Sequence, residues 1–197
     1  GGHAIFLSQN DTQLGRGETI ADTARVLSRY VDVIMYRAYR HVDMVNLAKH
    51  ATVPVINALD DKEHPCQITA DLLTIKEHKG RLKGLKLAYV GDGNNVANSL
   101  LLGGALVGMD VAIGCPDGYC PDPDIAAKAA SIAKENGAVS EVIRDPFEAV
   151  KGADIVYTDT WVSMGDEEEM AQRKKAMMPY QVNEALMSAA KPDAIFM

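Results

Sequence analysis

Short apolar runs typical of strands alternate along the whole chain with segments whose apolar residues recur at helical spacing. The run at residues 85–91 is nearly continuous in apolar residues, and a helical pattern follows it over residues 96–107. Strands of this kind between helices are typical of parallel sheets that are covered on both faces. The alternation therefore predicts an α/β fold, with two doubly wound parallel-sheet α/β domains joined by a long helix.

The pattern places these elements along the chain. We expect strands at residues 4–8, 32–37, 54–58, 85–91, 110–115, 139–144, 153–158 and 194–197. We expect helices at residues 18–30, 41–51, 65–79, 96–107, 123–136, 146–150 and 178–190.

A basic turn at residues 80–84 follows the long helix and is the expected domain boundary. Residues 1–80 would then form one domain and residues 81–197 a second. Because the chain opens directly into one apolar strand and stops on another, we expect both domains to be incomplete at the chain termini.

Composition excludes several classes of protein. With 47% hydrophobic and 24% charged residues, the chain has enough apolar material for a packed core. A net charge of -7 argues against a nucleic-acid partner, which requires a basic surface. Apolar runs fall short of a membrane span, and the first residues lack the pattern of a signal peptide. We therefore expect a cytoplasmic protein with no membrane partner.

The three cysteines, Cys66, Cys115 and Cys120, are an odd number without metal-type spacing to histidine. Reduced thiols are the default for such a set. Cys115 and Cys120 are close enough in sequence for a disulfide or a metal site, but a strand end followed by a Pro-Asp-Gly turn is the more typical context.

The segment 157–165 combines a buried strand end with polar side chains. Asp159 comes directly after the strand, where ligands of open α/β sheets bind. A carboxylate there favours a cationic group, so the segment indicates an amine or amino acid ligand. Gly165 and the acidic run at residues 166–169 suggest a mobile loop. The alternative is an Asp that only caps a strand-helix junction.

The loop at residues 91–96 follows a strand and opens a helix, as a dinucleotide-binding loop does. It has Gly91 and Gly93, but Val96 stands where the third small residue belongs. An ordinary tight turn is the alternative, in which Asn95 offers an amide near the helix start.

Four polar residues lie near strand ends or helix starts, namely Gln13, Arg37, His64 and Gln67. A guanidinium, an imidazole and amides suit a carbonyl or phosphate oxygen. Each has an ordinary alternative, such as a surface ion pair for Arg37 or a helix cap for His64. With Asp159 they describe two half-sites facing across a cleft, one for an anion and one for an amine.

Several of these motifs together resemble the ornithine carbamoyltransferases. The resemblance is carried in chain order by residues 64–67 (His-Pro-Cys-Gln), 71–74, 91–95, 98–99 and 159–165 (Asp-Thr-Trp-Val-Ser-Met-Gly). The last segment is specific to the ornithine branch, whereas His-Pro-x-Gln is shared with aspartate and other carbamoyltransferases. Cys66 stands where several members carry Thr, and the flanking His64 and Gln67 are kept.

The resemblance implies roles for individual residues. Gln13, Arg37, His64 and Gln67 match positions that bind carbamoyl phosphate, with Gln13 reaching a neighbouring subunit's site, and Arg37 and His64 match catalytic positions. Asn95, Asp159, Ser163 and Met164 match positions that bind ornithine. The Ser-x-Arg-Thr-Arg and His-Cys-Leu-Pro segments of the family would lie before residue 1 and after residue 197, so we expect the chain to be inactive alone.

The implied reaction is carbamoyl transfer from carbamoyl phosphate to the side-chain amine of L-ornithine, which gives L-citrulline and phosphate. The resemblance implies a cytoplasmic enzyme of arginine metabolism that uses no metal or organic cofactor and forms a homotrimer or a multiple of trimers. Two alternatives stay open, an NAD(P)-binding oxidoreductase domain built on Gly91 and Gly93, and a non-catalytic remnant.

Overall fold

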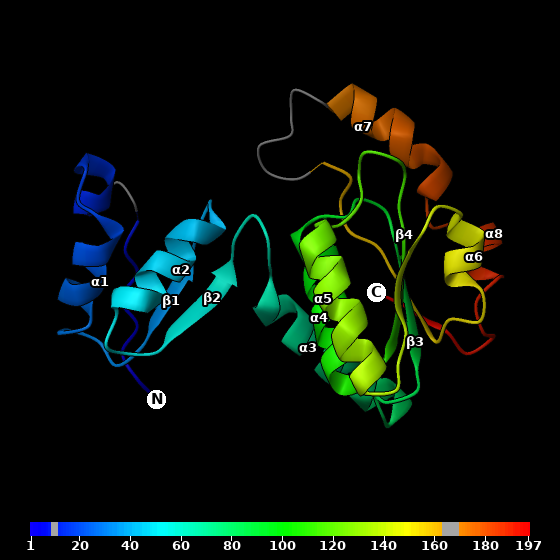
Figure 1. The fold of residues 1–197 in the computed structure, drawn as a ribbon, viewed down its shortest axis with the longest axis horizontal. Coiled ribbons are helices and arrows are strands. Elements are labelled where there is room, and N and C mark those ends of the chain that lie inside the picture. Colours follow the sequence, from blue (N-terminus) through cyan, green and yellow to red (C-terminus); the bar gives the residue numbers. More distant parts are fainter. Residues whose placement is uncertain (9–11, 163–169) are drawn as a thin grey trace. The chain divides into compact units, whose positions relative to one another are not determined.

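The structure, a computed structural model, describes residues 1–8, 12–162 and 170–197. The chain divides into two compact units, unit 1 with residues 1–61 and unit 2 with residues 62–197 (Figure 1). The strand pairs described in both units are parallel. The predicted α/β class with parallel sheets is therefore confirmed.

Unit 1 is built on a strand-helix-strand arrangement. Its elements are η2 (Gln13–Arg16), α1 (Ile20–Leu27), β1 (Ile34–Arg37), α2 (His41–His50) and β2 (Val55–Leu59). β1 and β2 pair in parallel, and a small core forms around Ala24, Ile34 and Leu47. Thr19 starts α1 because its side chain accepts a hydrogen bond from the backbone N–H of Asp22 at 3.1 Å.

The strand expected at residues 4–8 is wrong. The segment has no regular secondary structure, and its apolar side chains are exposed, Phe6 at 89%. A strand needs a neighbour that accepts and donates backbone hydrogen bonds. The described sheet of unit 1 consists of β1 and β2 and does not include this segment. The apolar run predicted a strand without identifying such a neighbour.

Unit 2 is a doubly wound parallel sheet. Its elements are α3 (Pro65–Lys79), β3 (Lys86–Val90), α4 (Asn95–Val107), β4 (Asp110–Gly114), α5 (Pro123–Glu135), β5 (Ser140–Ile143), α6 (Pro146–Val150), β6 (Ile155–Tyr157), α7 (Met170–Met177), η4 (Met178–Tyr180), α8 (Glu184–Met187) and β7 (Ile195–Phe196). The described strands lie in the order β5-β4-β3-β6-β7. The order reverses direction between β3 and β6, which makes this pair the topological switch point.

Alternate residues of the central strands face two separate cores. Leu87, Tyr89 and Tyr157 face the larger core, to which α3, α4 and α5 contribute, whereas Ala88 and Val90 face a smaller one that includes residues of α6 and α8. Figure 1 shows α4 and α5 on one side of β3 and β4 and α6 and α8 on the other. Successive side chains of a strand point to opposite faces, so both faces must be apolar.

The long helix α3 is part of unit 2. Its Ile68 and Ile75 are buried in the larger core. Its bounds, Pro65–Lys79, agree with the expected helix, and Gly80 ends it with a φ of 73°. Glycine adopts this left-handed conformation without steric cost, which is why the helix ends there.

The helix expected at residues 178–190 is wrong. The segment is divided into η4 and α8, and the helix α7 precedes it, which we did not predict. Asn183 starts α8 because its Oδ1 accepts a hydrogen bond from the backbone N–H of Leu186 at 3.0 Å. A side chain that caps a new helix start interrupts a helix that the apolar pattern alone would continue. None of the helices in the described ranges is long and apolar enough to cross a membrane.

Candidate active site

The carboxyl ends of β3 and β6 meet at the switch point of the sheet in unit 2. The two strands pair in parallel with Tyr89 opposite Tyr157, so the loops that follow them emerge side by side. The first loop covers residues 91–94, and the second begins with Thr158 and Asp159. Asp159 therefore lies at the edge of the sheet where ligands of doubly wound folds bind.

Asn94 joins the two loops. Its Oδ1 accepts hydrogen bonds from the backbone N–H groups of Val96 and Ala97, at 3.0 and 3.2 Å, and caps α4. Its Nδ2 is thereby directed away from the helix and donates to Oδ2 of Asp159 at 2.9 Å. A carboxylate has more than one acceptor position, so Asp159 can also bind a cationic group of a ligand. Asn95, a predicted site residue, is the first residue of α4.

Backbone conformation explains one glycine of the β3–α4 loop, and packing explains the other. Gly91 has a φ of 146°, which L side chains rarely adopt, and a Cβ on it would make only an ordinary contact with Oγ1 of Thr158 at 3.6 Å. A Cβ on Gly93 would lie 2.3 Å from the backbone nitrogen of Pro121, which is closer than such atoms approach. The chain's own backbone thus requires Gly93, and a bound pyrophosphate is not needed to explain it.

The start of α3 carries both residues predicted on this helix. The backbone N–H of His64 donates to Oγ of Ser99 at 2.7 Å. Gln67 donates from Nε2 to Oδ1 of Asp71 at 2.9 Å, and the hydroxyl of Tyr157 donates to Oδ2 of Asp71 at 3.0 Å. Because residues four apart are neighbours on a helix, Gln67 and Asp71 share one side of α3, and His64 stands at the N-cap position directly before it. The bond from Tyr157 connects that side to the end of β6.

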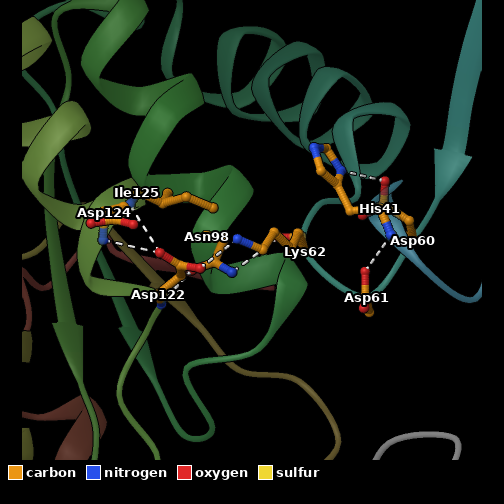
Figure 2. Close-up of polar contacts among 8 residues, drawn as sticks. All are labelled: His41, Asp60, Asp61, Lys62, Asn98, Asp122, Asp124 and Ile125. Carbon is orange, nitrogen blue, oxygen red and sulfur yellow. Dashed lines mark hydrogen bonds and ion pairs between the residues drawn. The ribbon is translucent and has the colours of Figure 1, made fainter. Parts of the chain in front are cut away.

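Hydrogen bonds also fix the segment that precedes His64 (Figure 2). Asn98 on α4 donates from Nδ2 to the backbone oxygen of Lys62 at 3.0 Å, and its Oδ1 accepts from the backbone N–H of Asp122 at 3.0 Å. Nζ of Lys62 lies 2.9 Å from Oδ2 of Asp122, and this ammonium lowers the pKa of that carboxyl. The segment leading into α3 is therefore held to both α4 and the start of α5.

Burial is the main cause of the pKa shifts of three residues near the ends of β3 and β6. Desolvation raises the pKa of Asp71, while hydrogen bonds from Gln67 and Tyr157 oppose that rise. Desolvation also raises the pKa of Tyr157 and of Tyr89, whose rings stack with centroids 5.9 Å apart. Both phenols are therefore neutral hydrogen-bond donors at neutral pH. Tyr89 donates to the backbone oxygen of Asp92 at 2.7 Å.

The carboxylate of Asp92 connects α7 to the β3–α4 loop. Asp92 is 7% exposed, and Arg173 on α7 donates from Nη1 to its Oδ2 at 2.8 Å. The guanidinium carbon of Arg173 lies 5.2 Å from the centre of the Tyr119 ring, a cation-π contact. The ion pair is thus largely withdrawn from water, where it is screened less than a surface pair.

The other predicted residues are distributed as follows. Gln13, the first residue of η2, and Arg37, the last residue of β1, lie in unit 1 and are exposed. Arg37 stands at the carboxyl end of its strand, as predicted. Ser163 and Met164, together with the acidic run at 166–169, lie outside the described residues.

In unit 1, the residues after β1 are held to the end of β2 (Figure 2). Nδ1 of His41 lies 2.8 Å from Oδ2 of Asp60, a fully buried carboxylate. Asn57 donates from Nδ2 to the same oxygen at 2.8 Å. The backbone N–H of His41 donates to Oδ1 of Asp61 at 2.6 Å. This network fixes the chain that follows Arg37.

The cysteines are free thiols. Cys115 directly follows β4, and the chain turns at residues 117–118, as predicted. Its sulfur lies 3.4 Å from that of Cys120, and burial raises the pKa of the Cys115 thiol to about 12. This thiol is therefore a poor nucleophile at neutral pH. Among the described residues, no group of three or more His, Cys, Asp or Glu side chains is arranged to hold a metal ion.

Three residues that organise the site had no predicted role, namely Asn94, Asp71 and Tyr157. Asn94 was detectable as a capping residue directly before a helix. Asp71 was detectable as a carboxylate four residues after Gln67, on the side of a helix that also carries apolar residues. Tyr157 gave no such signal, because a tyrosine in an apolar strand is usually a core residue.

Two family models match the chain. The carbamoyl-P binding domain of the aspartate/ornithine carbamoyltransferases matches residues 1–77, and the Asp/Orn binding domain of the same family matches residues 83–197. These matches do not support the dinucleotide-binding alternative.

Named relatives are similar along the whole chain. An ornithine carbamoyltransferase of Picrophilus torridus is 59% identical over 100% of this chain and 65% of its own length. One from Symbiobacterium thermophilum is 59% identical over 100% of this chain and 64% of its own length. The solved structure of ornithine carbamoyltransferase from Pyrococcus furiosus superposes with a TM-score of 0.93 at 56% identity, covering 98% of this chain and 62% of that one. The chain thus spans somewhat less than two thirds of these relatives, and it belongs to the aspartate/ornithine carbamoyltransferase family.

Proposed function

We propose that the whole protein transfers the carbamoyl group of carbamoyl phosphate to the side-chain amine of L-ornithine, giving L-citrulline and phosphate. The observation that carries the proposal is the position of Asp159, held by Asn94 at 2.9 Å where β3 and β6 end. A carboxylate at this edge suits the α-amino group of an amino acid. The relatives named ornithine carbamoyltransferase support the choice of ornithine over aspartate.

The two substrates are assigned to two parts of the chain, which divide near residue 80. We propose that carbamoyl phosphate binds to the first part and ornithine to the second. The proposed carbamoyl-phosphate residues Gln13, Arg37, His64 and Gln67 all fall within the match to the carbamoyl-P binding domain. The proposed ornithine residues Asn95, Asp159, Ser163 and Met164 all fall within the match to the Asp/Orn binding domain.

The proposed reaction passes through a tetrahedral intermediate. The neutral side-chain amine of ornithine attacks the carbamoyl carbon, and the carbonyl oxygen gains negative charge. In this proposal Arg37 and His64 donate hydrogen bonds to that oxygen, a contribution for which loss of one donor typically costs about 3 kcal/mol of the barrier. The intermediate then collapses, the bond from carbon to the phosphate oxygen breaks, and the nitrogen loses a proton.

Asp159 has a different role in this mechanism. By holding the α-amino group, it directs the other amine of ornithine toward the carbamoyl carbon, and such orientation can contribute several kcal/mol. Phosphate is a good leaving group, so the chemistry requires no metal or organic cofactor. From the family resemblance we also propose a cytoplasmic homotrimer, or a multiple of trimers.

The test is an assay of the full-length protein for citrulline with both substrates. We expect citrulline and phosphate in equal amounts, and no release of phosphate above background when aspartate replaces ornithine. A fluorescence titration with NADH is the matched control, and we expect no saturable binding. Absence of citrulline together with saturable NADH binding would contradict the proposal.

A further inference from the structure

The buried carboxylate of Asp71 accepts hydrogen bonds from two side chains that come from different parts of unit 2. Asp71 is 5% exposed on α3, and a buried carboxylate is costly unless it is hydrogen-bonded. Gln67 supplies a bond at 2.9 Å to one oxygen, and Tyr157 supplies one at 3.0 Å to the other. The carboxylate is therefore satisfied by one neighbour on its own helix and one at the end of β6.

This arrangement fixes the orientation of the Gln67 amide. An ionised carboxylate only accepts hydrogen bonds, so the amide must direct Nε2, and not Oε1, toward Asp71. The hydroxyl of Tyr157 lies against the other oxygen of the same carboxylate. Oε1 then lies on the other side of the amide carbon from Asp71. At this position Gln67 offers a ligand a hydrogen-bond acceptor.

An acceptor at this position distinguishes between acyl donors. Carbamoyl phosphate carries an N–H group beside its reacting carbon, whereas acetyl phosphate carries a methyl group of similar size. A fixed hydrogen-bond acceptor binds the N–H group of carbamoyl phosphate, but it forms no hydrogen bond with the methyl group of acetyl phosphate. If the amide could rotate, its NH2 group would face the ligand half of the time, and this preference would fall.

We propose that Asp71 is a positioning residue. It holds the Gln67 amide so that the carbonyl oxygen of Gln67 selects an acyl-donor substrate with an N–H beside the acyl carbon. The proposal rests on the proposed carbamoyl transfer. Through Tyr157, the same carboxylate holds α3 against the strand that leads to Asp159. Asp71 thereby connects a residue assigned to carbamoyl phosphate, Gln67, with the residue assigned to the α-amino group of ornithine, Asp159.

The test compares the binding of carbamoyl phosphate and acetyl phosphate to the full-length protein. Asp71→Asn removes the charge but keeps the shape, and its own amide can present an N–H to Oε1 of Gln67 and so permit the reversed orientation. We expect carbamoyl phosphate to bind about tenfold more weakly, the effect of one lost hydrogen bond, and acetyl phosphate to change by less than about twofold. Glu77→Gln, the equivalent change at an exposed position of the same helix, should alter neither affinity.

A second pair of variants separates positioning from stability. Tyr157→Phe removes the other donor but leaves the bond from Gln67, so the preference for carbamoyl phosphate should stay within about threefold of wild type. Asp71→Glu keeps the charge but displaces the acceptor, and it serves if Asp71→Asn does not fold. We expect the same selective loss for it.

The outcomes distinguish this proposal from the proposed function. Equal losses of both ligands in the Asp71 variants, or no loss of either, would overturn the positioning role. If the wild-type protein binds neither carbamoyl phosphate nor acetyl phosphate and forms no citrulline, the proposed function itself fails.

Discussion

Asn94 has two roles that substitutions can separate. Its Oδ1 caps α4 through bonds of 3.0 and 3.2 Å, and its Nδ2 holds Asp159 at 2.9 Å. Asn94→Ala removes both roles. Asn94→Ser keeps a capping oxygen, but its short side chain has no donor that reaches Asp159.

The expected magnitudes differ between stability and binding. Loss of a helix cap costs about 1 kcal/mol, which lowers the melting temperature by about 3 °C for a domain of this size. Loss of a hydrogen bond to a charged group costs about 1.5 to 3 kcal/mol. Because Asp159 is partly exposed, we expect the lower cost, about 1.5 kcal/mol, when the bond from Asn94 is lost. A loss of this size in binding free energy corresponds to about tenfold weaker ornithine binding.

The assays are thermal unfolding and the apparent affinity for ornithine, both with full-length protein. We expect Asn94→Ala to lose stability and ornithine affinity, and Asn94→Ser to lose only ornithine affinity. Wild-type ornithine affinity in Asn94→Ser would refute the role assigned to the bond with Asp159. An equal loss of stability in both variants would refute the capping role.

Three further outcomes follow from the packing. Gly93→Ala should lower the free energy of unfolding in a denaturant titration by about 1 to 3 kcal/mol, because its Cβ would meet the backbone of Pro121; unchanged stability would contradict this. Arg173→Met should lower the free energy of unfolding by about 3 to 5 kcal/mol in the same titration, since it leaves the charge of Asp92 buried without its partner. A loss below about 1 kcal/mol would show that the ion pair is not withdrawn from water. Iodoacetamide at pH 8 should label the exposed Cys120 in the folded protein, but it should label the buried Cys115 only after unfolding. Peptide mass spectrometry measures both, and labelling of Cys115 in the folded protein would contradict its burial.

Much of unit 2 could be predicted from the sequence because its signals are local. β3 is nearly continuous in apolar residues, with Lys86 as its one charged residue, and Pro65 and Gly80 mark the two ends of α3. These features depend on nearest neighbours along the chain. The segment at residues 4–8 carries an equally apolar pattern but no strand, because pairing depends on another segment that no local pattern identifies.

The candidate site was predictable in its residue types but not in its connections. Asp159 was placed correctly at a strand end, since that position follows from the alternation of elements. The bond from Tyr157 to Asp71 joins residues 86 positions apart, and only the fold brings them together. The same holds for Arg173 and Asp92, which are 81 positions apart.

The most direct test of the division between the two substrates is the effect of Asp159→Asn on the affinity for each. This substitution keeps the size of the side chain and removes its charge. We predict that ornithine binds about a hundredfold more weakly, since a charged partner is lost, while the affinity for carbamoyl phosphate stays within about threefold. Losses of equal size for both substrates would contradict the assignment of the amine to Asp159.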